Sequence, residues 1–245
     1  EKIEERVKSV SDTLRLSSFL NLPARKLTAD QKQLISLGRG LVREDVAGVL
    51  MDEPLTVIDP DLKFRLRRNL KEINEQYKTT LVYVTHDQNE AMTFADNIIV
   101  MDQGEIVQVG LPKDLFERPK TTFVGYFIGS PAMNIFESEV SSDYSVKINN
   151  IEIKTNSNLS KIKDKNVKLG IRSEFINVAE KEGQNTIKAS LKRVEDFGNF
   201  KLLTANMGDF VIKSKVNREM PISNGDINLY IPPEKCCVYI NEKLI

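Results

Sequence analysis

Apolar positions follow one pattern in the first half of the chain and another in the second, and the change falls near residues 129–134. In the first half, short runs rich in Val and Leu at residues 47–51 and 80–85 are typical of buried parallel strands. Between them, apolar residues recur at helical spacing, and two residues ahead of this stretch suit an N-cap and a first helical residue. The pair is Asp59 and Pro60, and the apolar stripe consists of Leu62, Leu66, Leu70, Ile73 and Tyr77. We therefore expect an α/β domain, with a hairpin at 97–110 that turns at Gln103 and Gly104.

The second half changes to short runs with period-two alternation, which predict strands separated by turns. These runs lie at 144–154, 167–172, 186–194, 200–206, 210–216 and 227–232. Many short strands with regular turns favour a small barrel or sandwich. The segment "KTNSNLSKIKDKN" at 154–166 is rich in Lys and Asn, which is more typical of a solvated loop than of a binding patch.

Composition narrows the class of protein only a little. The 245 residues suffice for one large or two small domains. Because Lys plus Arg and Asp plus Glu both total 35, net charge gives no argument for nucleic acid or an anionic membrane as a partner. No apolar run approaches the ~20 residues of a membrane span. Cys236 and Cys237 are adjacent in a strand-like run and fit reduced thiols better than a strained vicinal disulfide, so we expect a cytosolic chain.

Both predicted strands of the first half end in residues suited to phosphoryl chemistry. "VLMDEP" ends in Asp52 and Glu53, a pair that can hold a magnesium ion and a water beside a nucleotide phosphate. His86, the only histidine, ends the other strand. Adjacent parallel strands end at one sheet edge, where ligands of open α/β sheets bind, so we expect these three residues to lie at the same candidate site. A purely structural histidine and an acidic strand end that only caps a turn remain alternatives. Asp87 and Glu90 form a D-x-x-E pattern, which predicts a capping box for the next helix.

The order of several motifs carries a family resemblance. "LTADQKQLISLGRGLV", "VLMDEPLTVID" and "VYVTHDQNEAMTFADNIIVMDQGEIVQVG" resemble the signature helix, the Walker B strand with its D-loop, and the switch histidine of the ATP-binding cassette of ABC transporters. "LPKDLFERPKTTFVGYFIGSPAMN" is similar to the ATPase subunits of carbohydrate importers, of the maltose and glycerol-3-phosphate type. "LGIRSE", "VEDFGNF" and "IPPEKCCVYI" resemble the OB-like regulatory domain of that subfamily. The resemblance implies the C-terminal part of a P-loop ATPase domain over 1–133 and an all-β, OB-like domain over 134–245.

The same resemblance implies a role for each matched residue. Asp52 would hold Mg²⁺, through water, and Glu53 would polarise the attacking water as general base. His86 would contact the γ-phosphate of ATP and this water, and Asp59 of the D-loop would touch a second ATPase subunit. These roles suit phosphoryl transfer, in which catalysis consists mainly of positioning and charge neutralisation.

The signature departs from the family's L-S-G-G-Q, because this chain has Leu27, Thr28, Ala29, Asp30 and Gln31. In the family this helix N-terminus caps ATP held by the other subunit, and an N-terminus is a natural anion site. Ala29 restricts the backbone's approach to phosphate. Asp30 adds a carboxylate that repels the phosphate, because two like charges 4 Å apart cost about 4 kcal/mol at an effective dielectric constant near 20. T-x-x-Q is still a capping box, so we expect the helix to form normally while its phosphate binding is impaired. The alternative is a tolerated variant of the signature with near-normal activity. Ser173 replaces the usual proline of the "GIRPE" motif and affects only a turn.

A nucleotide site also needs a phosphate cradle, usually G-x-x-x-x-G-K-[ST], and these 245 residues contain none. The chain opens with "EKIEERVKSV", where Ile3, Val7 and Val10 already have helical spacing. We expect the cradle to lie upstream in a longer protein, and the chain as printed to be inactive toward ATP.

The partners implied are a second ATPase subunit, identical or related, two transmembrane permease subunits and a solute-binding protein. The implied location is peripheral, on the cytoplasmic face of the cell membrane, and the implied solute is a sugar or sugar phosphate. A non-hydrolysing regulatory subunit paired with an active one is the alternative, and an intact upstream cradle would favour the enzyme. A soluble cassette protein of ribosomes or DNA repair fits the second half less well.

Overall fold

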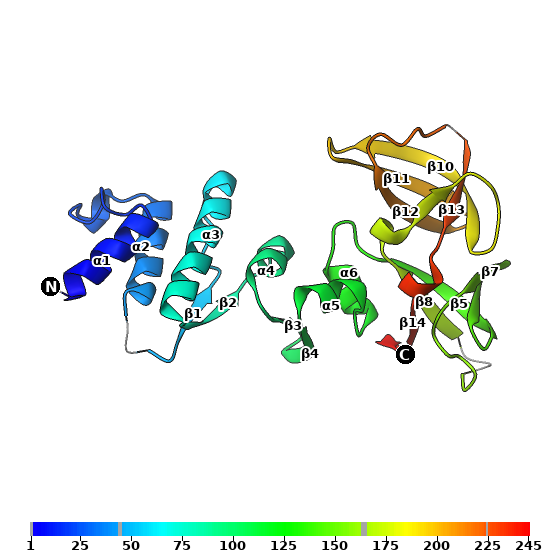
Figure 1. Cartoon of the computed structure of the whole chain (residues 1–245), viewed down its shortest axis with the longest axis horizontal. Helices are drawn as coiled ribbons and strands as arrows, with labels where there is room; N and C mark the ends of the chain where they lie inside the picture. Colours follow the sequence, from blue (N-terminus) through cyan, green and yellow to red (C-terminus); the bar gives the residue numbers. More distant parts are fainter. Residues whose placement is uncertain (1, 44–45, 163–165, 224) are drawn as a thin grey trace. The chain divides into compact units, whose positions relative to one another are not determined.

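The computed structural model describes residues 2–43, 46–162, 166–223 and 225–245 (Figure 1). The side chains of residues 60, 61, 76 and 77 also lie outside the description, so Tyr77 of the predicted stripe is not placed. The chain divides into two compact units, Glu1–Ala95 and Asp96–Ile245. Each unit is described by itself.

The first unit is mixed α/β, as the sequence predicts. Its elements in chain order are α1 (Lys2–Thr13), the 3₁₀ turn η1 (Ala24–Lys26), α2 (Ala29–Leu41), β1 (Gly48–Asp52), α3 (Pro60–Tyr77), β2 (Thr80–Val84) and α4 (Gln88–Phe94). Strands β1 and β2 are parallel, in a register that pairs Asp52 with Val84. The expected strand–helix–strand unit is therefore confirmed, and both strands end at one edge.

The core of this unit lies between the helices and one face of the two strands. Met51 is buried and Val49, Leu81 and Tyr83 pack partly buried against it. The opposite face is open: Leu50 is 82% exposed, and Val82 and Val84 are also exposed. The prediction of fully buried strands is thus wrong for the described residues, because successive side chains alternate between faces and the helices cover only one of them.

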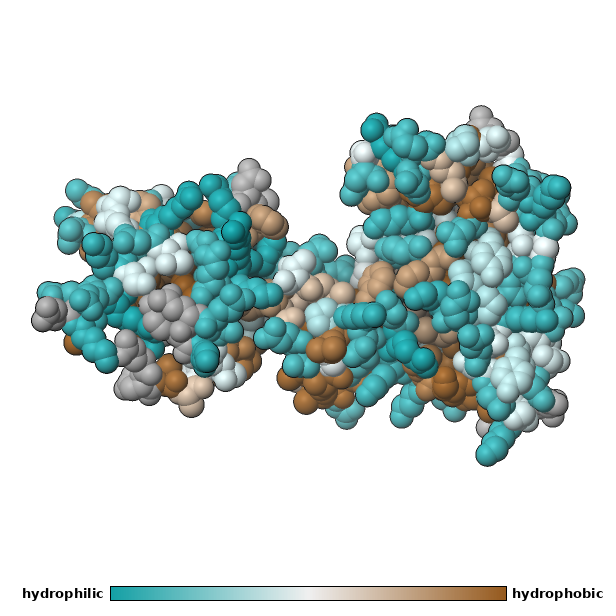
Figure 2. All heavy atoms as spheres, viewed as in Figure 1, coloured by the Kyte–Doolittle hydropathy of each residue, from teal (hydrophilic) through white to brown (hydrophobic). Residues whose placement is uncertain are grey.

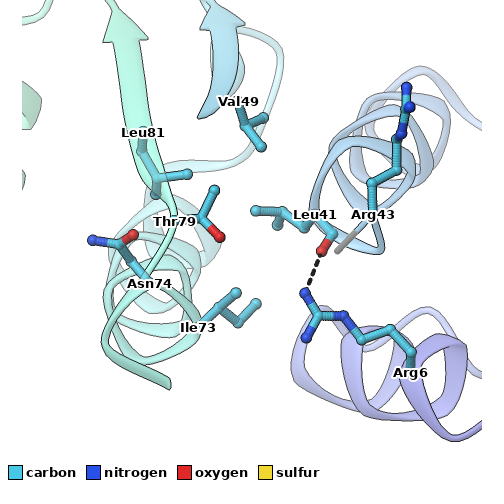
Figure 3. A pocket seen from close by; sticks show the side chains of 8 residues that line it. All are labelled: Arg6, Leu41, Arg43, Val49, Ile73, Asn74, Thr79 and Leu81. Atoms are coloured by element: carbon cyan, nitrogen blue, oxygen red, sulfur yellow. Dashed lines mark hydrogen bonds between the residues drawn. The ribbon is translucent and has the colours of Figure 1, made fainter. Parts of the chain in front are cut away.

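Helix α3 buries the stripe that its sequence predicts. Leu66, Leu70 and Ile73 are buried in the same core, and Leu62 packs against it partly buried. The helix begins at Pro60, as expected from the Asp-Pro pair. Figure 3 shows a small cavity between these helices and strands, where the Arg6 guanidinium of α1 donates to the Leu41 carbonyl at the end of α2, at 3.2 Å. A cation at the C-terminal end of a helix satisfies a carbonyl left without an intrahelical partner.

The second unit opens with a hairpin and two short helices. The elements are β3 (Ile98–Asp102), β4 (Glu105–Gly110), α5 (Pro112–Glu117) and α6 (Thr122–Phe127). Gln103 and Gly104 both have positive φ, 48° and 84°, so the predicted turn is confirmed in a conformation that hairpins favour. Apolar side chains project from the hairpin into solvent, and they form a brown patch in Figure 2: Ile99, Met101, Ile106 and Val109.

The remainder of this unit is all β, as predicted. One sheet has the order β12-β11-β10-β13-β9 and the other β15-β14-β8-β5-β6-β7. The strands are β5 (Asn134–Ser142), β6 (Ser145–Ile148), β7 (Ile151–Lys154), β8 (Asn166–Ile171), β9 (Asn177–Ala179), β10 (Thr186–Asp196), β11 (Phe200–Met207), β12 (Phe210–Asn217), β13 (Asp226–Tyr230), β14 (Cys237–Ile240) and β15 (Lys243–Leu244). The 3₁₀ turns are η2 (Ser173–Phe175) and η3 (Pro233–Lys235). A single apolar core contains residues from both sheets, including Phe136, Leu169, Leu203 and Leu229.

The segment expected to be a solvated loop is partly structural. Leu159 within it is fully buried, and its amide donates to the Asp143 carbonyl at 2.7 Å. Residues 163–165 of this segment lie outside the described residues. The boundary predicted between residues 133 and 134 falls at the start of β5 and remains a prediction, since the two compact units divide earlier, after Ala95.

Arg172, directly after β8, is completely buried. Its guanidinium donates to the carbonyls of Phe116 at 2.9 Å and Gly125 at 2.8 Å, and also to that of Ile128, and it lies over the Phe116 ring. Burial lowers the pKa of this guanidinium from its usual value. The side chain therefore ties the β domain to α5 and α6. Ser173, where the resembling family has proline, begins the 3₁₀ turn η2, so the turn forms without the proline.

Among the helices of the described residues, none is both long and apolar enough to cross a membrane.

Candidate functional site

The chain turns sharply where β1 ends, and this turn sets the direction of Glu53. The Glu53 amide still donates to the Val84 carbonyl of β2 at 3.0 Å, so it extends the parallel pairing by one bond. Its φ of 47° lies in the left-handed region, which is uncommon for a residue other than glycine and often marks a functional position. The reversal brings the Glu53 side chain to the end of β2.

Glu53 and His86 meet at this edge. The Glu53 carboxylate atom Oε1 lies 2.6 Å from His86 Nδ1 and accepts from the His86 amide at 3.2 Å. The other carboxylate oxygen, Oε2, accepts from the Thr56 hydroxyl at 2.8 Å. The shared strand edge predicted from the sequence is thus found, and the structure adds a direct contact between Glu53 and His86. Thr56 joins the pair although the sequence pattern had not singled it out.

These contacts favour the ionised form of Glu53. Its pKa is lowered from the ordinary value, chiefly by the hydrogen bond with His86 and then by that with Thr56. The His86 side chain is 76% exposed, so its ring remains open to solvent and to a ligand at the sheet edge. The pair therefore offers an ionised acceptor next to an accessible imidazole.

Asp52 lies beside this pair but faces solvent. A groove runs next to it between α2 and β1, lined among others by Gln33, Leu37, Leu50 and Asp52. Gln33 of α2 donates from Nε2 to the Glu53 carbonyl at 2.9 Å, so α2 is tied directly to the turn that aims Glu53. Gln33 was not predicted, because a single glutamine on a helix carries no distinguishing pattern.

The N-terminus of α2 has the predicted cap but an altered surface. Gln31 Oε1 accepts from the Thr28 amide at 3.0 Å, completing the capping-box arm that the sequence predicts. The Thr28 hydroxyl donates to the Asp30 carboxylate, and this bond is the main cause of the lowered pKa of Asp30. Ala29 and Thr28 are exposed. This helix end therefore carries the ionised carboxylate of Asp30, and the Thr28 hydroxyl is already hydrogen-bonded to it.

Asp59 lies one residue before α3 and is exposed. Its carbonyl accepts from the Lys63 amide at 2.8 Å, which places it at the cap position expected from the sequence. Its contact with a partner subunit remains a prediction.

Comparison with known proteins identifies the lineage. Residues 129–176 match the family model of the MalK OB fold domain. The sn-glycerol-3-phosphate import ATP-binding protein UgpC of Yersinia enterocolitica is 36% identical over 239 residues, covering 95% of this chain and 66% of that protein. The oligosaccharides import ATP-binding protein MsmX of Bacillus subtilis is 34% identical, covering 92% and 64%. The trehalose/maltose import ATP-binding protein MalK of Thermococcus litoralis is also 34% identical, covering 92% and 63%.

Along nearly its whole length the chain is similar to ATP-binding proteins of carbohydrate-type ABC importers. It spans a little under two thirds of the length of these relatives. The OB-like fold predicted for the second half agrees with the matched family model.

The carboxylates at the strand edge fit a magnesium ion that is held in part by groups outside this chain. No cluster of three or more His, Cys, Asp or Glu within the described residues could hold a metal ion by itself. Mg²⁺ in nucleotide sites usually takes one or two carboxylates together with phosphate oxygens and water, and the exposed Asp52 offers one such carboxylate.

The capping box predicted for Asp87 and Glu90 is wrong. Asp87 caps α4 by accepting from the amides of Asn89 at 2.8 Å and Glu90 at 3.3 Å, but the Glu90 side chain does not return to close a capping box. It turns into the protein instead, and the Asp87 amide donates to the Thr85 hydroxyl at 3.0 Å. A D-x-x-E pattern cannot distinguish these two arrangements, because tertiary partners decide where the glutamate points.

Proposed function

We propose that the complete protein is the ATP-hydrolysing subunit of an ABC importer that takes up a sugar or a sugar-phosphate-like solute. It docks on two transmembrane permease subunits at the cytoplasmic face of the membrane, pairs with a second ATPase subunit, and works with a solute-binding protein on the other side. The observation that carries this proposal is the contact between Glu53 and His86 at the strand edge beside Asp52, in a chain of the importer family.

The chain's own residues divide the work among them. Glu53, kept ionised by His86 and Thr56, acts as the general base toward the attacking water. His86 orients that water and donates to the terminal phosphate of ATP from its accessible ring. Asp52 would hold Mg²⁺, through water, and the chemistry that the ion would supply there is neutralisation of charge on the phosphate oxygens. Asp59 meets the second ATPase subunit from the start of α3.

The signature residues act on the nucleotide of the partner subunit. Thr28, Ala29, Asp30 and Gln31 form a helix N-terminus that faces this nucleotide. Because Asp30 is ionised and engages the Thr28 hydroxyl, this end binds phosphate more weakly than one built of glycines.

A second candidate is a non-hydrolysing subunit kept for assembly beside an active partner. The bond between Thr28 and Asp30 favours it, since it weakens the site that this chain would complete on its neighbour. The positioned Glu53 and His86 favour the enzyme, since a subunit without turnover has no need of an aligned base.

The test is ATP-driven solute uptake by the complete transporter in proteoliposomes. His86→Ala lowers ATP hydrolysis at least a hundredfold and removes uptake, whereas Glu72→Gln, an exposed glutamate on α3, leaves both unchanged. Equal hydrolysis in wild type and His86→Ala would reject the enzyme and leave the non-hydrolysing subunit.

A further inference from the structure

Glu90, in the first turn of α4, is one of the few buried charged side chains of the described residues, with 3% of its surface exposed. Its oxygens have separate partners. Oε2 accepts from the Tyr83 hydroxyl at 2.8 Å and the Thr85 hydroxyl at 3.0 Å. Oε1 lies 3.6 Å from both Lys63 Nζ and Arg67 Nη1 of α3. A carboxylate is costly to bury unless it is paired and hydrogen-bonded, and here two hydroxyls and two cations compensate it.

The hydrogen bond between Glu90 and the Thr85 hydroxyl holds the loop that carries His86. The Thr85 hydroxyl donates to Glu90 and also accepts from the Asp87 amide at 3.0 Å, so it fixes the residues before and after His86. Asp87 in turn caps α4, on which Glu90 itself lies. His86 is thus the exposed member of a loop whose neighbours on both sides are tied to one buried carboxylate.

The two cations paired with Glu90 belong to α3, the helix that follows Asp59. Lys63 and Arg67 lie one helical turn apart on α3, near its start. Asp59 is joined to the same turn, since its carbonyl accepts from the Lys63 amide. The start of α3 and the His86 loop therefore share Glu90 as a common partner.

We propose that Glu90 is a positioning residue that locks the His86 loop to the start of α3 and so holds the imidazole on Glu53. This inference rests on the proposed function, because it assigns to Glu90 the alignment of two residues that the function uses.

A purely structural Glu90 would affect stability without affecting the His86 ring, so the test observes that ring. His86 is the only histidine, which makes ¹⁵N-histidine NMR of the 245-residue chain a direct probe of it. A neutral ring held by Glu53 at Nδ1 carries its proton there, whereas a released neutral ring prefers the other tautomer.

We expect Glu90→Ala to lower the ratio of the Nδ1–H to the Nε2–H tautomer at least threefold. Thr85→Val should have the same effect while leaving the pairing of Glu90 with Lys63 and Arg67 in place, and it decides the question if Glu90→Ala does not fold. Glu90→Gln, which keeps an acceptor for Thr85 but loses the charge, should lie between. Glu72→Gln, on the exposed face of α3, serves as the matched control and should match wild type.

An unchanged tautomer ratio in a folded Thr85→Val or Glu90→Ala variant, with native circular dichroism, would overturn the proposal. The measurement needs no nucleotide. An absence of ATP hydrolysis in the complete transporter would therefore refute the proposed function while leaving the role of Glu90 to be judged on this result alone.

Discussion

His86 Nδ1 lies 2.6 Å from Glu53 Oε1, although the two residues are 33 positions apart in the chain. The contact follows from the parallel pairing of β1 and β2, which ends both strands at one edge, and from the left-handed turn at Glu53. It keeps the Glu53 carboxylate ionised beside the exposed His86 ring, and the proposed hydrolysis of ATP depends on this arrangement.

The first prediction concerns the titration of Glu53. Because its folded pKa is depressed, the contact stabilises the fold above the ordinary glutamate pKa, and this contribution is lost as pH falls through the folded value. We expect His86→Ala to raise the pKa of Glu53 toward its ordinary value, and Thr56→Val to raise it less. Carbon-13 NMR titration of the glutamate side chains measures both shifts. A larger effect of Thr56→Val than of His86→Ala would contradict the assigned cause.

A second prediction concerns the signature helix. Ala29→Gly together with Asp30→Gly removes the repelling carboxylate, frees the Thr28 hydroxyl and lets the backbone approach phosphate. In a complete transporter whose two ATPase subunits both carry this signature, we expect at least a tenfold rise in ATP turnover per dimer. Mass spectrometry of the purified complex establishes which subunits are present. In a mixed dimer with one intact signature, the rise should be small, and no rise in the homodimer would show that Asp30 does not approach phosphate.

The third prediction concerns the buried guanidinium of Arg172. Arg172→Ala removes a donor from three carbonyls, of which that of Gly125 still accepts from the Met133 amide at 3.2 Å; at about 1–3 kcal/mol for each of the other two we expect a loss of roughly 2–6 kcal/mol. Arg218→Ala is the control, since Arg218 forms an exposed pair with Asp196 and should change stability by less than about 1 kcal/mol. Urea unfolding followed by circular dichroism measures both. Equal losses in the two variants would show that burial of Arg172 contributes little.

The fourth prediction concerns thiol reactivity. Both cysteines are free, burial raises the pKa of Cys236 to about 12, and burial also raises that of Cys237. Since the thiolate is the reacting form, alkylation by iodoacetamide at pH 8 should be at least a hundredfold slower in the native chain than in urea. Mass spectrometry of the alkylated peptides measures the rates. Rapid labelling of Cys236 in the native chain would refute its burial.

The sequence predicts secondary structure well where one pattern dominates. The stripe of α3 and the turn at Gln103 and Gly104 are strong local signals, and both are found. The strand β5 was not predicted, because "NIFESEVSS" follows a boundary segment and its alternation is short. The open face of β1 and β2 was also missed, since Leu50 and Val82 are as apolar as buried residues and only the positions of the helices reveal their exposure.

Site prediction from sequence succeeds for strand ends and fails for tertiary partners. Glu53 and His86 could be brought together by the rule for parallel strands alone. Glu90 could not be placed, because its partners on β2 and α3 are set by packing and a capping box was equally consistent with the sequence. For Arg172, the sequence offered a signal, because a charged residue directly follows the apolar run "VKLGI". The alternation used to predict a strand does not take this signal into account.

The most direct test of the proposed function is Glu53→Gln in the complete transporter. Glutamine keeps the shape of the side chain but cannot act as a base, so we expect ATP turnover at the site served by this β1 strand to fall at least a hundredfold while ATP stays bound in closed dimers. Single-turnover hydrolysis and retained labelled ATP, measured on the same purified complex with Glu72→Gln as control, report both quantities. Hydrolysis at the wild-type rate in Glu53→Gln would contradict the assignment of Glu53 as the base.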